Sequence, residues 1–96
     1  MAPDNGRFHL TLAVAMMAQK KPDLKAARGQ LETAVRILWA DDDAGGLVRA
    51  YFNLGMIAQQ GRHFPEARTW YRKALGQDPN DEATLAAMES LEGAKD

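Results

Sequence analysis

One pattern of small and large apolar residues occurs twice in this chain, 40 residues apart. The paired positions are Leu24 and Phe64, Ala27 and Ala67, Leu31 and Tyr71, Ala34 and Ala74, and Val35 and Leu75. Their spacing of three and four residues is that of one face of an α-helix. The same shift pairs Thr11, Val14 and Ala15 with Tyr51, Leu54 and Gly55. Each copy thus holds two apolar stretches separated by a short polar turn, which predicts a helical hairpin that is repeated.

The second copy, Val48 to Asp81, carries aromatic, small and proline residues in a characteristic order. These residues are Tyr51, Leu54, Gly55, Phe64, Ala67, Tyr71, Ala74 and Pro79. Their order and the 34-residue span closely resemble the tetratricopeptide repeat. Two positions depart from that pattern: the turn glycine, Gly61, comes one residue earlier than usual, and Ala58 stands where an aromatic is common. The first copy, residues 8–41, resembles the repeat only weakly, because it lacks the aromatic, the Leu-Gly pair and the closing proline.

The resemblance implies an all-α fold, a right-handed stack of antiparallel helical hairpins with two repeats, a C-terminal capping helix and five helices in all. We expect the single domain to consist of a divergent repeat over 8–41, a loop over 42–47, a well-matched repeat over 48–81 and a capping helix over 82–93. Such a capping helix would give the stack a polar outer face.

Helix boundaries can be predicted from charge and proline. Three Asp residues follow Ala40 and would oppose the dipole at a helix C-terminus, so the second helix should end near Ala40, and the Asp run should help to cap the third. Pro22 and Pro65 suit first helical positions. Asn80 or Asp81 is expected to cap the last helix. In that helix we expect Leu85, Met88 and Leu91 to point inward, and we expect His63, in the preceding hairpin's turn, to have a structural role.

Few residues of this chain could carry out covalent or metal chemistry. It has no Cys, one serine, Ser90, and two histidines, His9 and His63. Gly45-Gly46 is not followed by the Lys-Ser or Lys-Thr pair of a phosphate-binding loop. The contiguous carboxylates of residues 41–43 lack the alternating ligands of a calcium loop. We therefore expect no enzyme activity, no cofactor and no metal site.

Charge and hydropathy bear on the remaining classes of partner. The net charge is -1, without the basic excess of a nucleic-acid-binding protein, so no nucleic-acid partner is expected. The apolar stretch Phe8 to Ala18 has the length of a signal-peptide core. However, Asp4 stands where a basic region is required, and His9 and Thr11 interrupt the run. We interpret this stretch as the first helix, and we expect no membrane insertion because it is too short to span a bilayer. A cytoplasmic location is expected.

The resemblance also implies a binding surface, because in this family the first helix of each hairpin lines a groove that binds peptides or helices of other proteins. Carrying over the register of the repeat gives nine candidate partner-binding residues: His9, Leu12, Met16, Lys20, Arg49, Phe52, Asn53, Met56 and Gln59. None of these residues is acidic, and four are apolar. The expected partner is therefore another protein or peptide, amphipathic and with an acidic end. The alternative for Leu12 and Met16 is that they belong to the core and are covered by Phe52.

One known binding mode of the family is absent. Some members hold a partner's C-terminal carboxylates with a clamp of Lys, Asn and Arg side chains from three repeats. Asn53 matches one clamp position, but Leu12, Met16, Ala83 and Ala87 occupy the other polar and basic positions. The chain is therefore not expected to bind chaperone tails in that way.

A second hypothesis concerns association of the chain with itself. Fewer than three complete repeats are marginal for a stack of this kind. Trp39 lies at the end of the second helix, where it either packs against that helix end or serves as an exposed anchor for a second subunit. The alternative to a peptide-binding adaptor is therefore a homodimeric assembly element that uses the divergent first repeat and Trp39.

Overall fold

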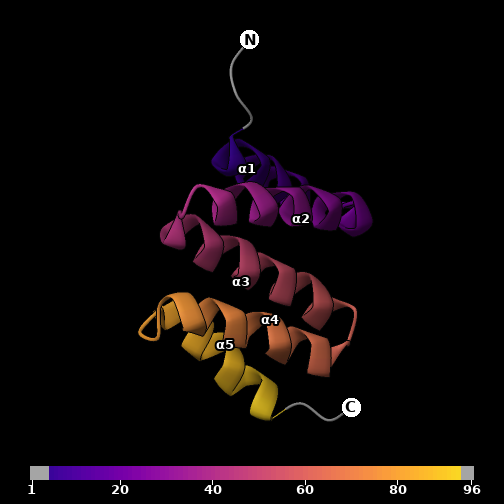
Figure 1. Cartoon of the computed structure of the whole chain (residues 1–96). Helices are drawn as coiled ribbons and strands as arrows, with labels where there is room; N and C mark the ends of the chain where they lie inside the picture. The colour runs from indigo at the N-terminus through magenta and orange to yellow at the C-terminus, as the bar shows by residue number, and fades with distance from the viewer. Residues whose placement is uncertain (1–4, 94–96) are drawn as a thin grey trace.

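The structure is a computed structural model, and it describes residues 5–93 of the chain. Its elements are the α-helices α1 (Gly6–Met17), α2 (Leu24–Ala40), α3 (Ala44–Gln60), α4 (Phe64–Gln77) and α5 (Glu82–Glu92). No strand occurs among the described residues, so the prediction of an all-α fold with five helices is confirmed. Figure 1 shows the helices stacked along one direction of the molecule.

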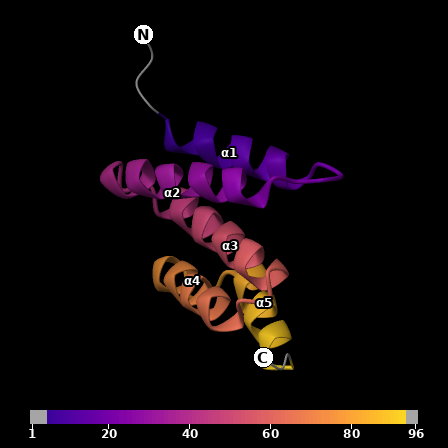
Figure 2. The same cartoon turned by 90° about the vertical axis from the view of Figure 1, so that its right-hand side faces the viewer.

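Two antiparallel hairpins, α1–α2 and α3–α4, form the stack, and α5 follows them. In Figure 1, α2 and α4 lie in front of α1 and α5, and Figure 2 shows the same arrangement from the side. α3 is the central element, since it packs against α1, α2 and α4. α5 packs mainly against α4. The helices α1, α3 and α5 therefore form one side of the stack, and α2 and α4 form the other.

The core is built from large side chains set against alanine and glycine. Ala27, Ala34, Ala67 and Ala74 are fully buried, as the repeat pattern predicts. Tyr71 is also fully buried, and its ring lies against Gly55, where α3 and α4 approach most closely. Its hydroxyl donates to Gln59 Oε1 over 2.7 Å, which satisfies the one polar atom of that side chain.

The first helix differs from the prediction by one residue in its register. α1 buries Gly6, Leu10 and Ala13, while Thr11, Val14 and Ala15 are exposed. The buried positions of α1 thus correspond to Leu47, Tyr51 and Leu54 of α3, at a shift of 41 residues rather than 40. The fold accommodates this one-residue difference in register because the loop between α1 and α2 has six residues, 18–23, whereas the loop between α3 and α4 has three, 61–63. The longer loop frees α1 from the register of α2.

The loop between the hairpins is shorter than expected. α2 ends at Ala40 as predicted, but α3 begins at Ala44, so the loop is residues 41–43 rather than 42–47. Asp43 caps α3, because its Oδ1 accepts the backbone N–H of Gly46 over 3.0 Å. This cap lets α3 start early, and its first turn buries Gly46 and Leu47.

Two further details of the helix ends differ from the prediction. Pro22 precedes the cap residue Asp23 and so lies outside α2. In α5, Leu85 is 45% exposed, while Thr84 is buried and its hydroxyl donates to the cap residue Asp81 over 2.6 Å. The prediction for Leu85 is wrong, because α5 packs mainly on α4 and turns Thr84, Ala87, Met88 and Leu91 toward its neighbours instead. Leu91 is buried as expected.

The turn between α3 and α4 is closed by Arg62 and not by a glycine. Arg62 has a φ of 62°, in the left-handed region, whereas Gly61 has an ordinary φ of -82°. The backbone N–H of His63 donates to the carbonyl of Ala58 over 2.9 Å, which closes the end of α3. Because the turn glycine comes one residue early, an arginine must adopt the conformation that glycine adopts most readily.

We predict that alanine at Gly55 destabilises the protein, whereas alanine at Gly29, another glycine inside a helix, stabilises it. An added Cβ would lie 2.6 Å from Tyr71 Cδ1, so Gly55→Ala should lower the free energy of unfolding by about 1 to 3 kcal/mol. Gly29 is the matched control, since it is also inside a helix but has no neighbouring atom within contact of an added Cβ. Gly29→Ala should instead stabilise the protein by about 0.5 to 1 kcal/mol. Urea unfolding measures both, and equal effects of the two changes would contradict the Tyr71 contact.

A second prediction concerns Arg62, whose guanidinium lies 5.5 Å from the centre of the Phe64 ring. Both Arg62→Gly and Arg62→Ala lose this cation–π contact, but only glycine relieves the left-handed backbone. The glycine variant should therefore be more stable than the alanine variant by about 1 kcal/mol. Thermal unfolding followed by circular dichroism gives the comparison. If the alanine variant were as stable as the glycine variant, the left-handed turn would be wrong.

Candidate functional site

The helices α1, α3 and α5 leave a hollow on their side of the stack. Its volume is about 220 Å³. It is lined by Val14 of α1, by Val48, Arg49, Phe52 and Asn53 of α3, and by Asp81 and Ala83 at the start of α5. At this hollow the start of α5 stands apart from α3, because α5 packs mainly on α4.

Two further hollows adjoin the first one. The second, of about 280 Å³, is lined by Arg7, Leu10, Thr11, Val14 and Arg49. The third, of about 440 Å³, is lined by Ala44, Gly45, Val48, Arg49, Gln77, Asp78 and Asp81. Arg49 lines all three, so its side chain lies at the centre of one continuous surface. We call the residues of these three hollows the inner surface.

The structure brings together only part of the predicted site on α3. Arg49, Phe52 and Asn53 lie together on the inner surface. Met56 is half-buried and packs with Phe52 against the core cluster around Tyr71. Gln59 uses its amide oxygen to accept the Tyr71 hydroxyl. The predicted stripe on α3 is therefore accessible mainly in the N-terminal half of the helix.

The predicted residues of the first repeat lie elsewhere. His9 Nδ1 is 2.8 Å from Gln30 Oε1, so His9 faces α2. Met16 is half-buried against the core, as the alternative interpretation holds, while Leu12 remains exposed. Lys20 lies in the loop after α1. None of these four lines the three hollows.

The inner-surface residues of α1 are instead Arg7, Leu10, Thr11 and Val14. The prediction missed this set because it transferred the register of α3 to α1 unchanged. The apolar spacing within α1 itself, Gly6, Leu10, Ala13 and Met17, was the available signal, since it marks the buried face independently of the repeat. Asp81 and Ala83 were missed because they belong to the start of the capping helix and not to a groove helix of either repeat.

An ion pair fastens the edge of the inner surface. Arg7 donates to Asp43 through Nε over 2.7 Å and through Nη2 over 2.8 Å. This fork, together with the Gly46 N–H bond, holds the pKa of Asp43 below its ordinary value. The pair joins the start of α1 to the start of α3. It also occupies Arg7, whereas Arg49 makes no ion pair among the described residues.

The polar groups on and near this surface suit binding better than proton transfer. No group of three or more His, Cys, Asp or Glu that could hold a metal occurs within residues 5–93. Burial raises the pKa of Tyr71 to about 12 and also raises the pKa of Tyr51, so both phenols stay protonated at neutral pH. Asn53 Nδ2 donates to the carbonyl of Arg49 over 2.8 Å. The surface therefore offers a ligand an apolar wall, amide groups, the carboxylates of Asp78 and Asp81, and the guanidinium of Arg49, which makes no ion pair within residues 5–93.

The architecture defines a helical-repeat protein with an open inner surface. The profile of the tetratricopeptide repeat matches residues 48–81, which run from α3 to the start of α5. Residues 48–81 are therefore a tetratricopeptide repeat. Repeats of this family are non-catalytic modules of protein–protein interaction. Comparisons with curated proteins and with solved structures gave no match. Within residues 5–93, no helix has the length and apolar character needed to cross a membrane.

We predict that the Arg7–Asp43 pair makes stability depend on pH. Since the folded-state pKa of Asp43 is depressed, the contribution of this carboxylate is complete above its unfolded-state pKa and is lost as the pH falls through the folded-state value. Asp43→Asn keeps a capping side chain but removes the pair. Its melting temperature should lie below wild type at neutral pH, and the gap should shrink below about pH 4.

The control is Asp41→Asn, the same change of charge two residues away, where no ion pair is formed among the described residues. Its melting temperature should follow the wild-type pH profile. A gap between Asp43→Asn and wild type that is constant from neutral to acid pH would show that the ion pair does not stabilise the fold.

Proposed function

We propose that the inner surface binds a segment of another polypeptide and that the protein acts as a non-enzymatic adaptor. The observation that supports this best is the position of Arg49. It is exposed, it lines three adjoining hollows, and it forms no ion pair with any described residue. A cation without a partner beside an apolar wall is suited to an acidic and apolar ligand, because the same ligand can neutralise the charge and cover the wall.

The apolar part of the ligand would lie between α1 and α3. Val14 is 38% exposed, and Phe52 is half-buried with one side of its ring against Tyr71, at 5.8 Å between ring centres. Ala83 closes the hollow from α5. An aliphatic or aromatic side chain placed there would remove Val14 and the open side of Phe52 from water, which is favourable in proportion to the apolar area covered.

The charges of the inner surface also give the ligand a direction. Asp78 and Asp81 border the third hollow, on the side of α4 and α5, whereas Thr11 and Arg7 border the second hollow. An acidic residue of the ligand would be repelled by the two carboxylates and would therefore sit between Arg49 and α1. The expected ligand is amphipathic, with its acidic end toward α1 and a neutral or basic end toward Asp78.

A second copy of the chain is the other candidate for an occupant. Trp39 is 63% exposed and Phe8 is exposed to a similar extent, and such side chains favour association with another surface. Neither of these two residues lines the inner surface. Self-association through them would leave the inner surface open, so it can coexist with the adaptor function.

We predict that Arg49→Glu weakens the binding of ligands to the inner surface. Peptides selected by the wild-type protein from a random displayed library should combine an acidic residue with an aliphatic or aromatic one. Arg49→Glu should weaken binding of the selected peptides by at least about tenfold, because it replaces attraction by repulsion at the centre of the site. Fluorescence polarisation with labelled peptides provides the affinities.

The matched control is Arg72→Glu, the same change on α4 at an exposed position outside the inner surface. It should leave the affinity unchanged, and both variants should keep wild-type circular dichroism and melting. Equal losses from the two variants would mean that only net charge matters. A stable dimer by light scattering with Arg49 in its interface would also overturn the proposal.

A further inference from the structure

The charges of this molecule are separated between its two ends. One end, at the right of Figure 1, holds the loops 18–23 and 61–63 and the first turns of α2 and α4. The charged residues of these segments are Lys20, Lys21, Asp23, Lys25, Arg28, Arg62 and Glu66, and the last turns of α5, where Leu91 packs with Phe64, add Glu89 and Glu92 at the margin of this end. The opposite end holds the loops 41–43 and 78–81 and carries Asp41, Asp42, Asp43, Asp78, Asp81 and Glu82, with Arg7 beside them. The near-zero net charge of the chain therefore conceals a basic end and an acidic end.

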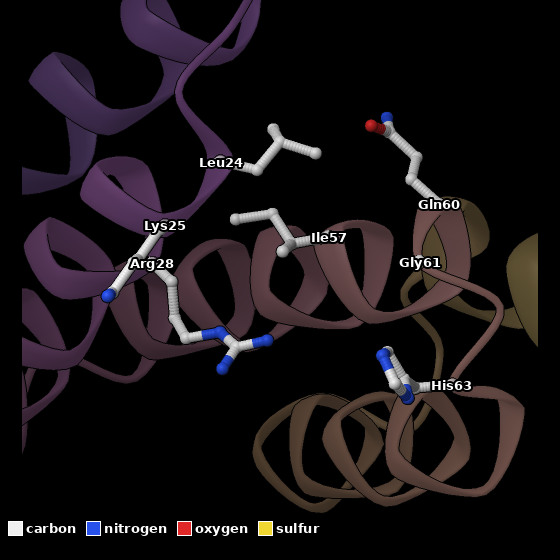
Figure 3. A pocket seen from close by; sticks show the side chains of 7 residues that line it. All are labelled: Leu24, Lys25, Arg28, Ile57, Gln60, Gly61 and His63. Atoms are coloured by element: carbon white, nitrogen blue, oxygen red, sulfur yellow. The ribbon is translucent and has the colours of Figure 1, made fainter.

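A hollow of about 370 Å³ opens at the basic end, where the two hairpins meet. It is lined by Leu24, Lys25 and Arg28 of α2, and by Ile57, Gln60, Gly61 and His63 around the end of α3. Figure 3 shows Leu24 and Ile57 close together, with the Arg28 guanidinium and the His63 ring directed toward each other below Ile57. The absence of a side chain at Gly61 leaves room for the His63 ring, since an added Cβ would lie 2.9 Å from His63 Cδ2.

Of the three basic side chains that line this hollow, Lys25, Arg28 and His63, the last two make at most a weak interaction with other described residues. Arg28 pairs with Glu66, whose Oε2 lies 3.9 Å from Arg28 Nη2, and both side chains are about half-exposed, so this pair contributes little. His63 occupies the cap position of α4, but its side chain makes no capping hydrogen bond. The expected structural role of His63 is therefore carried by its backbone N–H, which closes the end of α3. Its imidazole makes no capping bond and is available to a ligand.

We propose that this hollow is a second docking site, separate from the inner surface, for an acidic segment of a partner polypeptide. One aliphatic side chain of the segment would lie on Leu24 and Ile57, and a neighbouring carboxylate would lie between Arg28 and His63. The wider basic end would attract further acidic residues of the segment. The apolar floor argues for a polypeptide over a nucleic acid, because a phosphodiester backbone has no group to place on Leu24 and Ile57.

The experiment uses nuclear magnetic resonance of the ¹⁵N-labelled full chain with a synthetic peptide of Asp and Glu residues around one Leu. Two control peptides replace the Leu with Ser, or the acidic residues with Asn and Gln. Only the parent peptide should shift the amides of Leu24, Arg28, Ile57 and His63 in a saturable manner. The titration is repeated in Arg49→Glu, so that binding at the inner surface is removed and the two proposals can fail separately.

Variants at the rim make the test specific. Arg28→Glu should weaken the peptide by about tenfold, because the carboxylate then meets a like charge. Glu66→Gln should strengthen binding by about twofold, since it removes the weak competitor for Arg28. Arg36→Glu is the matched control on the same helix, exposed and outside the hollow, and it should leave the affinity unchanged. All three positions are exposed, so circular dichroism should show an intact fold.

Several results would overturn the proposal. An affinity equal for the Leu and Ser peptides would show attraction by charge alone, and equal losses for Arg28→Glu and Arg36→Glu would show the same. Amide shifts that disappear in Arg49→Glu would assign the peptide to the inner surface. Single-stranded DNA that shifted the same four amides at lower concentration than the peptide would assign the basic end to nucleic acid.

Discussion

The packing of the Tyr71 ring against Gly55 is the contact on which the rest of the structure depends. It allows the backbones of α3 and α4 to approach closely, and it leaves Tyr71 fully buried with its hydroxyl bonded to Gln59. Because this contact fixes the rotation of α3 about its own axis, it also decides which residues of α3 face outward. Arg49 and Asn53 are exposed or half-exposed because Gly55 and Ala58 are turned toward α4.

The well-matched repeat could be predicted from its sequence for this reason. Gly55 and Tyr71 are a complementary pair, one lacking a side chain and the other filling the space, and such a pair permits a single register. The first repeat has no equivalent pair, since Ala15 and Leu31 stand at the corresponding places. Without that constraint α1 settles with Leu10 and Ala13 inward, and the residues of α1 on the inner surface could not be transferred from α3.

The turns illustrate the same limit on what sequence alone can predict. The early position of Gly61 could be seen in the sequence. Its effect on the turn could not be predicted, because the turn could either shift by one residue or place another residue in the left-handed region. The structure keeps the length of the turn and places Arg62 in the left-handed region. Likewise, the Asp run could be recognised as the end of α2. Asp43 also caps α3 and binds Arg7, 36 residues away. This second role could not be predicted, because it depends on how the two hairpins lie side by side.

Both proposed docking sites lie where the two hairpins meet. The inner surface joins Val14 to Arg49, and the hollow at the basic end joins Leu24 to Ile57, so each site takes side chains from both hairpins. A stack of two repeats has few neighbouring interfaces from which to draw stability. A ligand that bridges the hairpins binds only while they remain stacked, so its binding free energy adds to the stability of the stack. The joint between the hairpins is thus the place where binding and folding reinforce each other, and α3 contributes to both sites because it forms that joint.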